Sequence, residues 1–155
     1  MDNKAFTILI IEDEPDISEL IEYNLTQSGY SIIVSNNGEK GIEITRKHLP
    51  DLILLDLMLP GIHGIDVCRI LKNDKDTSSI SIIMLTALGQ EEDIIKGLET
   101  GADDYVTKPF SFPILEARIV SVLRRIKNVN IEKEKVFNSG IVISSRKREI
   151  QIDGK

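Results

Sequence analysis

The chain has one cysteine, Cys68, and no tryptophan among its 155 residues. A lone cysteine excludes an internal disulfide and is typical of a reducing compartment, so we expect a cytoplasmic protein. Long apolar runs are also absent. None approaches the roughly 18 residues that a membrane-spanning helix needs, and the N-terminus lacks the apolar segment of a signal peptide. The sequence therefore predicts no association with a membrane.

Basic residues are scarce in most of the chain and gather near its end. The net charge is −6 at neutral pH, divided into −11 for residues 1–123 and +5 for residues 124–155. An acidic body argues against nucleic-acid binding by that part of the chain. A hydrophobic content of 41% is too high for a disordered chain. We expect one domain of ordinary size with a small appendage.

Short aliphatic runs separated by helical patterns dominate residues 1–126. Several of the runs do not alternate between apolar and polar residues, which predicts strands that are buried on both faces. We expect strands at residues 7–11, 31–34, 51–56, 81–85 and 104–107. A segment with helical periodicity follows each strand, and the last helix is expected to end near Ile126. The pattern predicts an α/β fold: a doubly wound, five-stranded parallel sheet with the flavodoxin-like order 2-1-3-4-5 and helices on both faces.

The remainder of the chain has a different composition. Residues 127–135 are polar, and we interpret them as a linker after a domain that covers residues 1–126. Residues 140–144 and 149–152 alternate like strands, so we expect a short tail resembling a β-hairpin within residues 136–155.

Charged and hydroxyl side chains follow the predicted strands at their carboxyl ends. Glu12 and Asp13 follow the first strand, Asp56 ends the third, and Thr86 and Lys108 follow the fourth and fifth. Ligands of an open parallel sheet bind beyond these ends. Carboxylates that converge there repel one another unless a cation offsets their charge, and Mg²⁺ prefers a few carboxylates completed by water. The sequence therefore predicts a Mg²⁺ site with a lysine beside it.

Each of these residues has a simple structural explanation when it is taken alone. Asp13 or Asp56 could cap a helix, and Thr86 and Lys108-Pro109 could belong to turns. Their occurrence together, at successive strand ends, is far more specific to a functional site.

From about residue 7 to residue 125 the chain resembles the receiver domain of two-component response regulators. The motifs that carry the resemblance are Glu12-Asp13, Leu55-Asp56-Leu57-Met58-Leu59-Pro60-Gly61, Thr86-Ala87 and Lys108-Pro109-Phe110. The resemblance implies that Asp56 accepts a phosphoryl group from a sensor histidine kinase and that Mg²⁺ is required. It also implies that Asp13 and Asp56 bind Mg²⁺ directly, that Glu12 holds it through water, and that the backbone carbonyl of Met58 is a further ligand.

The same resemblance implies a switch. Lys108 would pair with the phosphate and precede a cis peptide bond, Thr86 would engage a phosphate oxygen, and the ring of Tyr105 would fill the space that Thr86 leaves. A carboxylate nucleophile of this kind is chemically reasonable, because Mg²⁺ and a lysine can neutralise the phosphoryl oxygens during transfer. We therefore expect a phospho-acceptor switch and not an enzyme.

Residues 101–110 resemble the OmpR/PhoB branch of transcription factors, and residues 136–155 resemble the first strands of its winged-helix domain, which would be incomplete here. The resemblance implies a homodimer on activation and DNA binding only through the missing C-terminal domain. The dimer face would contain Asp103, Asp104, Arg118 and Arg125, together with Ile94 and Ile114. These isoleucines depart from the family pattern, because a basic residue is usual at the first position and an acidic residue at the second.

Other protein classes fit the sequence less well. A phosphatase of the haloacid dehalogenase type would need a second aspartate two residues after the nucleophile, where Met58 stands. The alternative that stays open is a stand-alone receiver that signals by binding a protein partner.

Overall fold

The computed structural model describes residues 6–87 and 91–139, with side chains up to residue 126. Within these residues the strands form a five-stranded parallel sheet in the order β2-β1-β3-β4-β5, which confirms the predicted order. The strands are β1 (Thr7–Ile11), β2 (Ser31–Ser35), β3 (Leu52–Asp56), β4 (Ser81–Ala87) and β5 (Asp104–Lys108).

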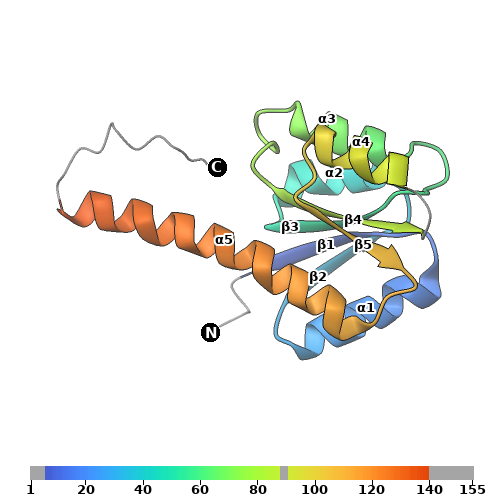
Figure 1. Cartoon of the computed structure of the whole chain (residues 1–155), viewed down its shortest axis with the longest axis horizontal. Coiled ribbons are helices and arrows are strands. Elements are labelled where there is room, and N and C mark those ends of the chain that lie inside the picture. Colours follow the sequence, from blue (N-terminus) through green and yellow to red (C-terminus); the bar gives the residue numbers. More distant parts are fainter. Residues whose placement is uncertain (1–5, 88–90, 140–155) are drawn as a thin grey trace. The chain divides into compact units, whose positions relative to one another are not determined.

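Helices cover both faces of this sheet, as predicted (Figure 1). The helices α2, α3 and α4 lie on one face, and α1 and the first turns of α5 lie on the other. Their bounds are α1 (Pro15–Gln27), α2 (Gly38–His48), α3 (Gly64–Lys72), α4 (Glu91–Thr100) and α5 (Phe112–Ser139). None of the described helices is both long and apolar enough to cross a membrane.

The central strands explain the non-alternating apolar runs. Every residue of β3 is buried, and β1 is buried from Ile8 onward. Since helices pack on both faces, successive side chains of one strand enter different layers of the core. Each fully buried leucine or isoleucine contributes roughly 1.5–3 kcal/mol through the hydrophobic effect. The same packing holds the strand ends in a definite register.

Local sequence signals set the helix starts. Pro15 occupies the first turn of α1, and the side chain of Asn37 caps α2 by accepting a hydrogen bond from the Lys40 backbone N–H at 2.8 Å. Both features satisfy or remove backbone N–H groups that have no partner inside the helix.

The last helix is longer than the sequence predicted. It continues through the predicted linker at residues 127–135 and ends at Ser139. Glutamate and lysine are good helix formers, so a polar composition does not distinguish a linker from a helix. The chain divides into two compact units, Met1–Val122 and Leu123–Lys155. The strands predicted at residues 140–144 and 149–152 lie outside the described residues.

Gly64, the first residue of α3, allows the loop after β3 to fold back against the end of that strand. A Cβ atom at this position would lie 2.5 Å from the backbone oxygen of Asp56 and 2.8 Å from the Cα atom of Leu57. The Gly64 N–H also donates a hydrogen bond to the Leu57 carbonyl at 3.0 Å. The obstructing atoms belong to the backbone, so they cannot rotate away from a side chain.

We expect Gly64→Ala to lower the free energy of unfolding by about 1–3 kcal/mol, the usual cost of forcing an extra carbon into a packed site. Urea unfolding measures this change. Gly97→Ala in α4 is the matched control, because its Cβ would meet only the flexible side chain of Met84, at 3.4 Å. Alanine also favours a helix over glycine, so the control should be as stable as the wild type. Equal stability of the two variants would show that the close approach at Gly64 is unimportant.

Candidate functional site

The structure brings the side chains of Glu12, Asp13 and Asp56 together at the carboxyl edge of the sheet. One carboxylate oxygen from each residue lies within 4.8 Å of the others. Glu12 and Asp56 are buried, whereas Asp13 is partly exposed. Hard oxygen ligands at such spacing are suited to a divalent cation such as Mg²⁺.

The strand register accounts for this convergence. Ile11 of β1 pairs with Leu55 of β3, so the residues that follow them, Glu12 and Asp56, lie side by side at the edge. Asp56 in turn pairs with Leu85 of β4. Thr86 directly follows Leu85, so Thr86 also lies at the carboxyl edge of the sheet. The next strand places Lys108 opposite Ala87.

Lys108 is the cation of this cluster. Its Nζ atom lies 2.9 Å from Oε1 of Glu12 and 3.4 Å from Oδ1 of Asp56. A third carboxylate, that of Glu14, lies 3.7 Å away through its Oε1 atom. Sequence reasoning did not single out Glu14. The acidic run Glu12-Asp13-Glu14 was a signal, but nothing in it indicates which side chains turn toward the lysine. The Lys108–Pro109 peptide bond is cis, as the resemblance implied.

The carboxylates carry more negative charge than one lysine offsets. Burial raises the pKa of Glu12 to about 7, and the charge of Asp56 adds to the shift while the hydrogen bond from Lys108 opposes it. Burial also raises the pKa of Asp13, and Asp56 contributes again. Burial by itself lowers the pKa of Lys108, but the hydrogen bond to Glu12 and the charge of Asp56 outweigh it and raise that pKa. Each shift indicates a site that favours additional positive charge.

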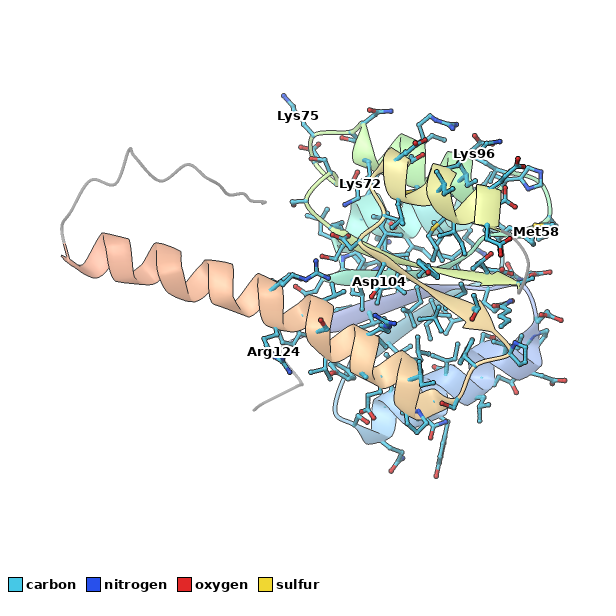
Figure 2. The ribbon with its side chains drawn as sticks, viewed as in Figure 1. Met58, Lys72, Lys75, Lys96, Asp104 and Arg124 are labelled. Atoms are coloured by element: carbon cyan, nitrogen blue, oxygen red, sulfur yellow. The ribbon has the colours of Figure 1, made fainter. Side chains whose placement is uncertain are left out.

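The carboxylate of Asp56 is held in place by the loop that follows it. The backbone N–H of Met58 donates a hydrogen bond to Asp56 Oδ1 at 3.2 Å, and the backbone N–H of Leu57 donates to Leu85 at 2.9 Å. The Met58 side chain is exposed, and Figure 2 shows it beyond the carboxyl ends of the strands. The loop that follows Asp56 therefore orients its carboxylate.

Thr86 is a buried residue of the site whose hydroxyl group is unpaired within the described part of the chain. It is only 1% exposed, and its hydroxyl oxygen has no hydrogen-bond partner among the described residues. Leaving a buried hydroxyl unpaired costs about 1–3 kcal/mol, so such a group in a folded protein suggests a partner that arrives with a ligand. Tyr105 on β5 pairs with Met84 of β4 and is 37% exposed.

Three of the charged residues predicted for a dimer face already have partners within the chain. The Nη1 atom of Arg118 lies 3.5 Å from Asp104 Oδ2 in the same chain. Asp103 also has partners within the chain, because its Oδ2 accepts the Ile82 N–H at 2.8 Å and lies 3.8 Å from Nζ of Lys72. In Figure 2, Lys72 and Asp104 lie away from Met58, toward the opposite end of the sheet.

The apolar part of that face is larger than the sequence suggested. Ile114 is 56% exposed, but Ile94 is only partly exposed. The more exposed apolar residues of α4 are Ile95, at 56%, and Leu98, at 42%, which sequence reasoning did not single out. Their spacing of three residues is that of one helix face, but only packing shows which face remains uncovered. Arg125 is exposed and belongs to the second unit.

Comparison with known proteins gives consistent relatives. The chain is 45% identical over 149 residues to the phosphate regulon transcriptional regulatory protein PhoB of Pseudomonas aeruginosa, covering 96% of this chain and 65% of that protein. It is 47% identical over 122 residues to the DNA-binding dual master transcriptional regulator RpaA of Synechocystis, covering 79% of this chain and 51% of RpaA. The chain thus spans less than two thirds of the length of these relatives.

Solved structures agree with the sequence relatives. The receiver domain of a Francisella response regulator superposes with a TM-score of 0.73 at 30% identity, covering 78% of this chain and 98% of that chain. DrrB, an OmpR/PhoB homologue from Thermotoga maritima, superposes with a TM-score of 0.69 at 34% identity, covering 77% of this chain and 53% of the DrrB chain. The family model of the response regulator receiver domain matches residues 8–120. This match includes the whole carboxylate cluster and all of the described strands except Thr7, the first residue of β1, and the chain belongs to the response regulator receiver family.

Proposed function

We propose that the chain is a phosphorylation-activated switch in which Asp56 accepts a phosphoryl group from a sensor histidine kinase with the help of Mg²⁺. The observation that carries this proposal is the position of the Asp56 carboxylate. It lies 3.4 Å from the Lys108 ammonium, and its oxygen is within 4.8 Å of those of Glu12 and Asp13. A nucleophile, a metal-binding group and a cation are thereby combined at one point.

The proposed reaction is a phosphoryl transfer. A carboxylate oxygen of Asp56 attacks phosphorus, the phosphorus–nitrogen bond of the phosphohistidine breaks, and the imidazole leaves with the electron pair. The product is an acyl phosphate on Asp56. Lys108 would pair with the phosphoryl oxygens. In the structure, carboxylate oxygens occupy the positions around its ammonium group instead.

The metal is Mg²⁺ in this proposal. The residues fit a cation because one carboxylate oxygen each of Glu12, Asp13 and Asp56 lies within 4.8 Å of the others, and the raised pKa values of Glu12 and Asp13 agree with this geometry. Asp13 and Asp56 would be direct ligands, the Met58 carbonyl a further one, and Glu12 would hold the metal through water. Bound Mg²⁺ would neutralise part of the negative charge on the phosphoryl group during its transfer.

The switch would act on transcription in a longer protein. PhoB and RpaA are named as transcriptional regulators, and RpaA as DNA-binding. Since the chain covers only part of each, we propose DNA binding for the full-length protein and not for the receiver domain. We propose that the receiver is itself the molecule that is phosphorylated and that it does not turn over a separate substrate. We also propose that it acts in the cytoplasm.

Asp56→Asn should abolish phosphorylation, because an amide cannot replace the attacking carboxylate. Wild-type protein with acetyl phosphate and Mg²⁺ should gain one phosphate by intact mass, and EDTA should prevent the gain. Asp51→Asn is the control. Asp51 immediately precedes the same strand, and its side chain accepts the Thr7 N–H at 2.8 Å, at the other end of that strand from Asp56. Labelling of Asp56→Asn at the wild-type rate would refute the assignment.

Thr86 and Tyr105 would transmit the signal. A phosphoryl oxygen would give the unpartnered Thr86 hydroxyl its missing hydrogen-bond partner, and the shift of Thr86 would make room for the ring of Tyr105. Such a pair is a two-state packing element that a local charge biases. The partial exposure of Tyr105 in the structure is consistent with the state before phosphorylation.

Thr86→Ala should accept phosphate at Asp56 yet lose the conformational response, because the phosphoryl group then has no hydroxyl to draw inward. NMR chemical shifts of Tyr105 and α4, recorded before and after phosphorylation, measure the response. Thr86→Ser is the control that retains the hydroxyl and should respond. A full response in Thr86→Ala would remove this residue from the mechanism.

Activation would produce a homodimer through α4, β5 and α5. Ile94 and Ile114 would meet across the two-fold axis, in place of the ion pair usual in the OmpR/PhoB branch. An exposed ion pair is worth about 0–1 kcal/mol, whereas burying two isoleucines gives about 1–3 kcal/mol. The exposed Ile95 and Leu98 extend the apolar area on α4. A dimer held in this way depends weakly on salt.

Ile94→Arg and Ile114→Glu should each weaken the dimer of phosphorylated protein about tenfold or more, since a charge would be buried without a partner. The double variant should recover the dimer, now with the salt sensitivity of an ion pair. Sedimentation at low and high salt measures both effects. Leu20→Glu on α1 is the control, as Leu20 is exposed elsewhere. If the single variants dimerise like the wild type, the dimer uses another face.

A further inference from the structure

Glu14 occupies an unusual position beside the site. It is the N-cap residue of α1, but its side chain makes no capping hydrogen bond. Its Oε1 atom instead lies 3.7 Å from Nζ of Lys108, while 62% of the side chain remains exposed. The carboxylate group able to share a metal consists of Glu12, Asp13 and Asp56 and does not include Glu14. Glu14 is thus a carboxylate that lies near the lysine but outside the group of carboxylates that could share a metal ion.

The three carboxylates around Lys108 differ in how easily they separate from it. Glu12, at 2.9 Å, and Asp56, at 3.4 Å, are buried and held within the strand-end cluster. Glu14 has the longest contact and the only exposed side chain of the three, so water can replace its interaction with Lys108 at little cost. It is the partner that an incoming anion would displace first.

Glu14 therefore opposes an anionic phosphodonor in two ways. It shares the ammonium group that the phosphoryl oxygens need, and its own negative charge repels the donor at the entrance to the site. Both effects grow with the charge of the donor, because the interaction energy is proportional to the product of the charges.

We propose that Glu14 is a specificity-determining residue that restrains Lys108 and disfavours highly charged small phosphodonors relative to donors of lower charge. This proposal rests on the proposed phosphorylation of Asp56. In the step concerned, the Asp56 carboxylate attacks phosphorus and the donor's leaving group departs with its electron pair. Glu14 forms no bond in that step and acts only through Lys108 and the local field.

A simpler account is that Glu14 stabilises the N-terminus of α1, where acidic side chains interact favourably with the helix dipole. Asp16 provides a direct comparison. It lies in the first turn of the same helix, is exposed, and has the same charge, but no ion pair joins it to Lys108. A role in the dipole or in net charge is common to both residues, whereas a role at Lys108 belongs to Glu14.

The experiment compares Glu14→Gln with Asp16→Asn at saturating Mg²⁺. Phosphorylation rates are measured with acetyl phosphate, a dianion at neutral pH, and with phosphoramidate, which carries less net negative charge. Removing one exposed charge contact is worth roughly 0.2–1 kcal/mol, so Glu14→Gln should react with acetyl phosphate about 1.4- to 5-fold faster. The gain with phosphoramidate should be smaller and both gains should shrink at high salt. Asp16→Asn should leave the ratio of the two rates unchanged.

Glu14→Lys is a second variant that reverses the charge, and it should shift the donor ratio further in the same direction. The Mg²⁺ affinity of each variant is measured by titration calorimetry, because a change of charge beside the site also changes its attraction for the cation, and the rates are compared at Mg²⁺ concentrations that saturate every variant. An unchanged donor ratio in both Glu14 variants, or an equal shift in Asp16→Asn, would overturn this proposal. Failure of the wild type to be phosphorylated at all would instead overturn the proposed function.

Discussion

The repulsion among the buried carboxylates at the end of β1 and β3 is the constraint on which the rest of the site depends. Glu12 and Asp56 lie next to each other because their strands pair in parallel, and the lysine at the end of β5 offsets part of their charge. Burial raises the pKa of Glu12 to about 7, and the charge of Asp56 adds to the shift. In the proposed function a cation would bind to these carboxylates, and an anion would then bind beside Lys108.

The fold makes this arrangement tolerable by placing it on rigid elements. The strands that carry the charged residues are surrounded by a continuous apolar core, and Gly64 lets the next helix start close to Asp56. The free energy gained from the core offsets the cost of holding like charges together at one edge. The loops beyond the strands then supply access, as is usual for open α/β sheets.

The site and the proposed signalling face are separate surfaces of one sheet. The hydroxyl of Thr86, near the carboxyl end of β4, has no hydrogen-bond partner among the described residues, and Tyr105 lies on the neighbouring strand β5 and is partly exposed. The exposed isoleucines of α4 and α5 lie on elements that follow β4 and β5 in the chain. In the proposed switch, a small movement at a strand end would change the apolar surface that α4 and α5 present to a second copy of the chain.

The sequence by itself determined the strand order, the helix-covered sheet and the convergence of Glu12, Asp13, Asp56, Thr86 and Lys108, because apolar periodicity and strand-end chemistry are local properties that the parallel topology maps onto one edge. Tertiary structure alone decided which neighbours those residues have. It turned Glu14 toward Lys108, gave Asp103 partners inside the chain, left Ile95 more exposed than Ile94, and continued α5 through residues 127–135. Side-chain direction, burial and the end of a polar helix depend on contacts between segments distant in the chain, which no local pattern contains.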